Sequence, residues 1–128
     1  MNMITNPALL PKLRSDALLG AVRGMPCALR ISSFIPGWSC ADPATVVPCH
    51  IDMTIGKGMS TKVSDLFVAA GCAHCHDLID GRDRKGRDYI TANYPTAMVE
   101  RILKGMAETQ ARWVDMGLLH ANGMTVVR

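Results

Sequence analysis

Residues 71–81 read Gly-Cys-Ala-His-Cys-His-Asp-Leu-Ile-Asp-Gly, and this stretch decides what kind of fold the chain can build. It contains Cys72-x2-Cys75, in which two thiolates two residues apart can turn onto one tetrahedral metal ion at ~2.3 Å. The residues after the second cysteine can continue for one or two helical turns until Gly81, a residue that commonly follows a helix. The stretch therefore predicts a metal knuckle that opens into a short helix.

A closed metal site needs two further ligands, and cysteines upstream can supply them. The chain has five cysteines, and in a reducing cytosol they are better interpreted as metal ligands or free thiols than as disulfides. Pro36 and Gly37 lie between Cys27 and Cys40 and can turn the chain back between these two. The predicted structural zinc site consists of Cys27, Cys40, Cys72 and Cys75. The alternative is a set of buried free thiols.

A haem protein is a second interpretation of the same stretch. Cys72-x2-Cys75-His76 has the attachment signature of c-type haem, and a methionine could supply the other axial ligand. Covalent haem attachment generally belongs to exported proteins, whereas residues 1–12 lack a basic segment followed by an apolar one and a cleavage site. Zinc is therefore the favoured cofactor, with c-type haem as the weaker alternative.

Length and composition indicate one globular domain. The chain has 128 residues, of which 48% are hydrophobic and 20% charged, as in ordinary soluble domains. It has no apolar run long enough to span a bilayer, so we expect a cytoplasmic protein with no membrane partner. We expect a flexible N-terminal arm over residues 1–11, a domain over residues 12–119 and a C-terminal tail over residues 120–128.

Hydrophobic spacing predicts the remaining elements. Apolar residues recur at helical spacing over residues 12–22, and imperfect alternation over residues 27–35 suggests a strand. Residues 45–51 are rich in β-branched side chains but contain Pro48, which favours an edge strand. Residues 54–64 should form a loop.

The long C-terminal helix has the strongest pattern. Asn93 and Pro95 fit its start. An apolar stripe follows that should face the core, with Leu103 and Met116 beside it. The stripe consists of Met98, Ile102, Met106, Gln110 and Trp113.

The net charge of +3 does not by itself indicate a polyanionic partner, but its distribution does suggest one. Residues 81–88 form a basic segment that could contact nucleic-acid phosphates. The basic side chains are Arg82, Arg84, Lys85 and Arg87. The alternative is a solvated loop in which Asp83 and Asp88 balance these charges.

The order of the parts resembles the HNH, or His-Me finger, endonuclease pattern: a strand with His50-Ile51, a glycine-containing loop, Asp65-Leu66, then Cys72-x2-Cys75-His76. Over about Leu13 to Leu119 the chain also resembles the YbcO-type putative nucleases of prophages. The stretches that support this are residues 27–31, 46–51, 64–66, 72–82 with Cys-His-Asp-x-Ile-Asp, and 105–110 with Gly-Met-Ala-x-Thr-Gln.

The resemblance implies an α+β fold, in which a small treble-clef (ββα-metal) zinc finger core carries an N-terminal helix and a long C-terminal helix. It also implies a metal-dependent endonuclease, encoded by a phage or prophage and acting on DNA. His50 would be the general base, and His76 would hold Mg²⁺ or another divalent ion. Asp65 takes the position of the pattern's asparagine and would orient His50 or act as a turn cap.

One residue departs from the HNH pattern. An aspartate commonly precedes the first histidine and binds the catalytic metal, whereas this chain has Cys49, whose soft thiolate suits zinc better than magnesium. Asp77 or Asp80 could complete a site for a hard ion instead. Catalysis could also have been lost, which would leave a zinc module that binds nucleic acid or a protein without cleaving it.

Overall fold

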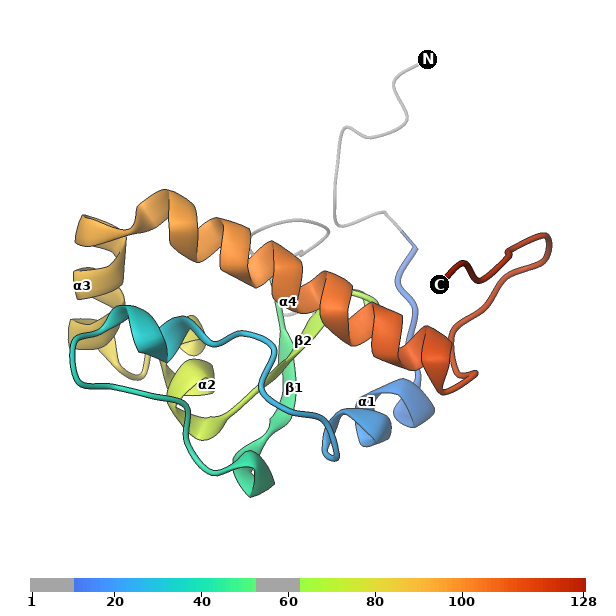
Figure 1. Cartoon of the computed structure of the whole chain (residues 1–128), viewed down its shortest axis with the longest axis horizontal. Helices are drawn as coiled ribbons and strands as arrows, with labels where there is room; N and C mark the ends of the chain where they lie inside the picture. The colour runs from blue at the N-terminus through green and yellow to red at the C-terminus, as the bar shows by residue number, and fades with distance from the viewer. Residues whose placement is uncertain (1–10, 53–62) are drawn as a thin grey trace, which may run out of the picture.

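The computed structural model describes residues 11–52 and 63–128, and in these residues it has an α+β fold. Helices surround a small antiparallel sheet (Figure 1). The elements in chain order are α1 (Asp16–Val22), the 3₁₀ helices η2 (Ile31–Phe34) and η3 (Pro43–Thr45), β1 (Val47–His50), β2 (Val68–Gly71), α2 (Ala73–Asp80), α3 (Arg84–Asn93) and α4 (Pro95–Asp115). The α+β class and the long C-terminal helix are thus confirmed. Most of the predicted arm and of the loop over residues 54–64 lies outside the described residues.

The two strands form the centre of the domain. β1 and β2 pair antiparallel, with Val47 opposite Gly71 and His50 opposite Val68. All of β2 is buried, whereas β1 buries only Cys49. Helix α4 crosses the sheet and packs on β2 (Figure 1). The predicted strand over residues 45–51 is therefore confirmed in its central part, and His50 lies at its end.

Polar side chains of α4 bind backbone groups of β2 and of the loop before it. The buried Thr109 hydroxyl accepts a hydrogen bond from the Ala70 N–H at 3.0 Å and donates to the Gly105 carbonyl at 2.8 Å. Gln110 Nε2 donates to the Leu66 carbonyl at 2.7 Å. A buried backbone group without a partner would cost about 1–3 kcal/mol, so these contacts fix where α4 lies on the sheet.

Gly105 lets α4 approach the segment that follows Cys27. A Cβ atom at this position would lie 2.9 Å from the Ala28 carbonyl oxygen, which is backbone and cannot rotate away. We expect Gly105→Ala to lower the free energy of unfolding by about 1–3 kcal/mol, as overpacking does. Gly20 in α1 is the matched control, because a Cβ atom there meets nothing within 4 Å. Urea unfolding of both variants is the measurement, and an equal effect of the two substitutions would contradict the role given to Gly105.

The first helix is shorter than the predicted range of 12–22. Ser15 caps it by accepting the Leu18 N–H at 3.2 Å, so α1 begins at Asp16. The residues before the cap are extended and pair with residues 63–65: Leu13 donates to the Ser64 hydroxyl and accepts from the Asp65 N–H at 2.9 Å. This pairing connects the start of the domain to the segment that carries Asp65.

The strand predicted over residues 27–35 is wrong. Arg30 has a left-handed backbone with φ 47°, and the 3₁₀ helix η2 follows directly. The reason is local: the Arg30 N–H donates to Cys27 Sγ at 3.5 Å, so the chain turns around the sulfur atom instead of extending past it.

The basic segment begins the helix α3 at Arg84 and is not the loop of the alternative interpretation. Asp83 accepts the Gly86 N–H at 2.9 Å and caps α3. Gly86 is buried, and a Cβ atom there would lie 2.7 Å from Leu78 of α2. This glycine therefore allows α3 to pack against α2.

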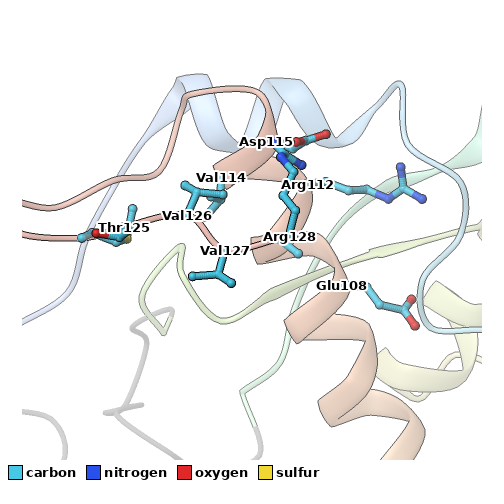
Figure 2. A pocket seen from close by; sticks show the side chains of 10 residues that line it. Glu108, Arg112, Val114, Asp115, Thr125, Val126, Val127 and Arg128 are labelled. Atoms are coloured by element: carbon cyan, nitrogen blue, oxygen red, sulfur yellow. Dashed lines mark ion pairs between the residues drawn. The ribbon is translucent and has the colours of Figure 1, made fainter.

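The C-terminal residues lie beside the end of α4. Arg128 forms an ion pair with Asp115 at 2.6 Å, and a cavity of about 620 Å³ separates α4 from Thr125, Val126 and Val127 (Figure 2). Neither a histidine nor a cysteine lines this cavity, so it is not the candidate site. Leu103 on α4 and Met116 just after it are exposed, so these two neighbours of the predicted stripe do not belong to the core. Within residues 11–52 and 63–128 no helix is long and apolar enough to cross a membrane.

Candidate functional site

The structure brings the four predicted cysteines together. Their sulfur atoms all lie within 4.8 Å of one another, although they come from three separate segments of the chain. Four thiolates at a Zn–S distance of ~2.3 Å would lie somewhat closer than this around one ion, so the arrangement fits a tetrahedral metal with little movement. The members of this cysteine cluster are Cys27, Cys40, Cys72 and Cys75.

Backbone N–H groups surround the cysteine cluster. Cys27 Sγ accepts from the N–H groups of Arg30 and Cys72 at 3.5 and 3.3 Å, and Cys72 Sγ accepts from the Ala41 N–H at 3.3 Å. Such donors stabilise thiolates, which are the metal-binding form of cysteine. Cys72 and Cys75 have no exposed surface, which favours an enclosed metal over a covalently attached haem.

The fifth cysteine has a different environment. Cys49 is buried on the opposite side of β1 from His50, and its sulfur lies against Gly71, where a Cβ atom would approach it to 2.6 Å. Burial raises the pKa of the Cys49 thiol to about 12, whereas the hydrogen bond from Cys75 and backbone donors lower the pKa of Cys27 to about 4. Cys49 is therefore a core thiol, and its side chain cannot replace the HNH aspartate as a ligand beside His50.

His50 forms a close pair with Asp65. His50 Nε2 lies 2.8 Å from Asp65 Oδ1, and the exposed fractions of the two side chains are 20% and 3%. A carboxylate can only accept hydrogen bonds, so Nε2 carries the proton and donates it. In the neutral imidazole Nδ1 is then the unprotonated nitrogen and can accept a proton from another molecule, whereas the protonated ring carries a charge beside Asp65.

Two contacts besides His50 determine the state of Asp65. The Ser15 N–H donates to Oδ2 at 2.8 Å, and Arg14 Nη1 lies 3.8 Å from Oδ1. Burial opposes ionisation of this carboxyl, but the hydrogen bonds from His50 and Ser15 and the charges of His50 and Arg14 lower its pKa below the ordinary value. Asp65 is therefore an ionised acceptor with fixed geometry, and its position is set by the start of α1.

A small cavity lies beside His50. Its volume is about 110 Å³, and its walls come from the end of β1, from α2, α3 and α4, and from η2. The polar or charged side chains that line it are those of His50, Asp52 and Arg87. The rest of the lining is Ile31, Ile51, Leu78, Ile79, Met98 and Ile102.

The second candidate histidine has its own carboxylate. His76 Nε2 lies 3.6 Å from Asp80 Oδ2, one helical turn further along α2, and both side chains are partly exposed. His76 does not line the cavity beside His50. His76 and Asp80 form the only histidine–aspartate ion pair found on α2. In the part of the chain that the structure describes, the cysteine cluster is the only group of three or more His, Cys, Asp or Glu ligand atoms close enough to hold a metal ion. An ion held there would need oxygen ligands from water or substrate, as Mg²⁺ sites commonly have.

The four predicted phosphate-binding residues differ in their surroundings. Arg82 forms ion pairs with Asp80 at 3.0 Å and Asp77 at 3.6 Å, which partly neutralise its charge. Arg84 and Lys85 are exposed on the first turn of α3. Arg87 differs from all three, because it alone lines the cavity that contains His50. Further along, Arg101 is engaged with Glu108 at 2.6 Å and is not part of a free basic surface.

Sequence reasoning missed two charged residues of the site. Asp52 lines the His50 cavity, and the alternation of side chains along a strand could have revealed it, since it lies two residues after His50. Arg14 contacts the Val63 carbonyl at 2.8 Å and Asp65 at 3.8 Å. No pattern in the sequence signals Arg14, because its partners lie about 50 residues away.

Comparison with known proteins gives consistent matches. A family described as "Putative nuclease YbcO" matches residues 16–118. Two curated relatives, from Escherichia coli strain K12 and from Enterobacteria phage 82, bear the same description, and each is 38% identical over 101 residues, covering 79% of this chain and 94% of the relative. A solved structure of a putative bacteriophage protein from E. coli K-12 is similar with a TM-score of 0.53 and 34% identity, covering 77% of this chain and 98% of that one.

Proposed function

The chain belongs to the YbcO putative nuclease family, and from this premise we propose that it is a metal-dependent endonuclease that hydrolyses phosphodiester bonds in DNA inside the bacterial cytoplasm. The treble-clef, HNH-type arrangement belongs to this proposal. It is supported by a cysteine cluster located between a β-hairpin and a helix, with a histidine at the end of the first strand.

The His50–Asp65 pair is the observation that supports catalysis most directly. Asp65 holds Nε2–H at 2.8 Å, so Nδ1 is the nitrogen that accepts a proton from water. The water oxygen adds to phosphorus, its proton goes to Nδ1, and the P–O bond to the leaving sugar oxygen breaks. That oxygen keeps the electron pair and takes a proton from solvent. A positioned base of this kind contributes about 10² to 10⁴ in rate.

Two kinds of metal belong to the proposal. The cysteine cluster would hold a structural zinc ion, which connects the Cys27 and Cys40 segment to α2. His76 and Asp80 would hold Mg²⁺ or another divalent ion, which would supply charge neutralisation at the phosphate and the leaving oxygen. Asp80 is chosen because it lies 3.6 Å from His76, although it also pairs with Arg82 at 3.0 Å, so the ion would have to displace this guanidinium. Asp77 pairs only with Arg82 among the described ion pairs and is left out of this ion site.

The exposed basic side chains at the start of α3 would bind the DNA backbone. Replacing Arg82, Arg84 and Lys85 by alanine should weaken binding by a similar factor for all sequences, because phosphate contacts do not read bases. The logarithm of the binding constant falls linearly with the logarithm of the salt concentration, and the slope of this line should become less steep by roughly 0.9 for each lost phosphate contact.

The measurement is a salt titration of fluorescently labelled duplex, with Arg23→Ala as the control. Arg23 is exposed at the end of α1, away from α3 (Figure 1). An unchanged salt slope in the triple variant would show that the basic segment is only solvated.

Asp65→Asn tests how His50 is oriented. An amide has one acceptor oxygen, but Asp65 accepts from both Ser15 N–H and His50 Nε2–H. The amide nitrogen, which is a donor, would therefore face one of these donors. If it faces His50, Nε2 must become the acceptor, so the proton of the imidazole moves to Nδ1. We expect nicking of supercoiled DNA to fall by about 10² or more, with DNA affinity and zinc content unchanged.

Arg23→Ala serves again as the matched control for the nicking assay. Full activity in Asp65→Asn would limit Asp65 to a turn-capping role.

A non-catalytic zinc module that binds nucleic acid or a protein is the second candidate. The burial of Cys49 favours it, because that position lacks the carboxylate ligand of the HNH pattern. This candidate requires the cysteine cluster but not His50, so substitutions at His50 distinguish the two.

A further inference from the structure

Arg87 lies where two hollows of the surface meet. It lines the cavity of about 110 Å³ beside His50 and also a hollow of about 410 Å³ next to it. The second hollow includes Asp80, which is the partner of His76, and Arg84. Arg87 is the residue that these two linings share, so it connects the His50 side of the site with the His76 side.

The guanidinium group of Arg87 has a defined position. Its Nη1 donates to the Ile79 carbonyl at 3.0 Å, and it lies close to Gly81, just past the end of α2. Carbonyl groups at a helix C-terminus attract a cation, which helps to hold the group there. A guanidinium has five N–H donors in a planar fork, and this contact uses one of them. The others can bind an anion.

The remaining basic residues do not share this environment. Arg82 is paired with Asp77 and Asp80, and Lys85 lines neither hollow. Arg84 lines only the larger hollow. Arg87 is exposed, but it combines a cation that is hydrogen-bonded to the Ile79 carbonyl, an adjacent cavity and a neighbouring proton acceptor in His50.

We propose that Arg87 binds the scissile phosphate itself, and so is a catalytic residue distinct from the basic residues that hold the DNA backbone elsewhere. This rests on the proposed nuclease function. The planar fork matches two phosphate oxygens, as arginine–phosphate pairs commonly do. The negative charge that grows on these oxygens as water attacks would strengthen the contact in the transition state.

The test uses a minimal phosphodiester, thymidylyl-(3′→5′)-thymidine, and the NMR signals of the four histidine rings. His50→Ala identifies the His50 signal. In the zinc-loaded wild type this signal should shift saturably as the dinucleotide is added. In Arg87→Gln, which loses the charge but keeps an N–H donor for the Ile79 carbonyl, the apparent affinity should fall about tenfold or more. Arg23→Gln removes an exposed arginine from α1 and should behave as wild type.

Nicking of supercoiled DNA is the second readout. Arg87→Gln should lower the single-turnover rate by about 10², while the affinity for long duplex falls far less. A wild-type His50 signal that does not respond to the dinucleotide, or that responds equally in Arg87→Gln, would overturn the proposal.

The nicking assay separates this proposal from the nuclease function. If the wild type nicks DNA and Arg87→Gln nicks as fast, the role of Arg87 is wrong and the nuclease stands. If the wild type never nicks but the His50 shift requires Arg87, then Arg87 binds a phosphodiester, whereas both its catalytic role and the nuclease function are wrong.

Discussion

Cys72→Ser is expected to yield a chain that lacks its metal ion and is largely unfolded. Cys72 is wholly buried, and its sulfur lies within 4.8 Å of those of Cys27, Cys40 and Cys75. Structural zinc contributes about 10–16 kcal/mol in small zinc domains, whereas a whole domain is stable by only about 5–15 kcal/mol. Loss of one ligand can therefore remove most of the stability. Metal analysis should find about one zinc per wild-type chain, and circular dichroism should show loss of helix in the variant.

Cys49→Ala is the matched control for this experiment. Cys49 is as buried as Cys72, but its sulfur packs against Gly71 and Val47 outside the cysteine cluster. We expect the variant to keep its zinc and to lose about 1 kcal/mol of unfolding free energy, as point substitutions do on average. A wild-type protein that folds cooperatively without metal would contradict the zinc site. A Soret absorption band would support the c-type haem alternative instead.

His50→Ala is expected to separate binding from cleavage. His50 is partly exposed and forms its only described side-chain hydrogen bond with Asp65, so its loss should change zinc content, thermal stability and DNA affinity little. The removal of a general base should nevertheless lower metal-dependent nicking by about 10² to 10⁴. The measurement is the single-turnover nicking rate beside the affinity for the same DNA.

His76→Ala provides the contrast to His50→Ala. His76 and Asp80 are proposed to hold the divalent ion, so loss of His76 should also abolish nicking. A higher concentration of the ion should then partly restore activity, because mass action can compensate for a weakened site. It should not rescue His50→Ala, whose missing group moves a proton. Rescue of both variants, or of neither, would mean that the two histidines are assigned incorrectly.

The sequence was sufficient to predict the cysteine cluster and the helix that follows Cys72. Cys72-x2-Cys75 and the glycine after Asp80 are local signals, and the structure has helix α2 between Cys72 and Gly81 as expected. The partners Cys27 and Cys40 followed from the need for four ligands, and their sulfur atoms join the cluster. Metal ligand sets can be predicted in this way because few residue types satisfy them.

Long-range packing explains what the sequence did not reveal. The turn around Cys27 Sγ replaces the predicted strand over residues 27–35, since the sulfur binds the Arg30 N–H. Gly86 allows α3 to contact Leu78 of α2, and no local pattern in the sequence signals this contact. The place of Arg87 beside His50 depends on this contact between helices, so composition could indicate a basic segment without showing which arginine lines the cavity.

The family resemblance of residues 105–110 has a structural explanation in the contacts of α4. Gly105 permits close approach to the Ala28 carbonyl, Thr109 binds the Ala70 backbone, and Gln110 binds the Leu66 carbonyl. These residues thereby hold the helix across both the cysteine segment and the segment that carries Asp65. Their role is to position the site and not to take part in the chemistry.

The nicking of supercoiled plasmid by the zinc-loaded wild-type chain tests the central claim most directly. The assay compares added Mg²⁺, Mn²⁺, Ni²⁺ or Zn²⁺ with a mild chelator that leaves the structural zinc in place. If His50 and Asp65 form a working general base, open-circular product should appear with at least one of these ions and disappear with the chelator. DNA that is bound but remains uncut with every ion, whether supercoiled, single-stranded or branched, would contradict the claim and leave a nucleic-acid-binding zinc module.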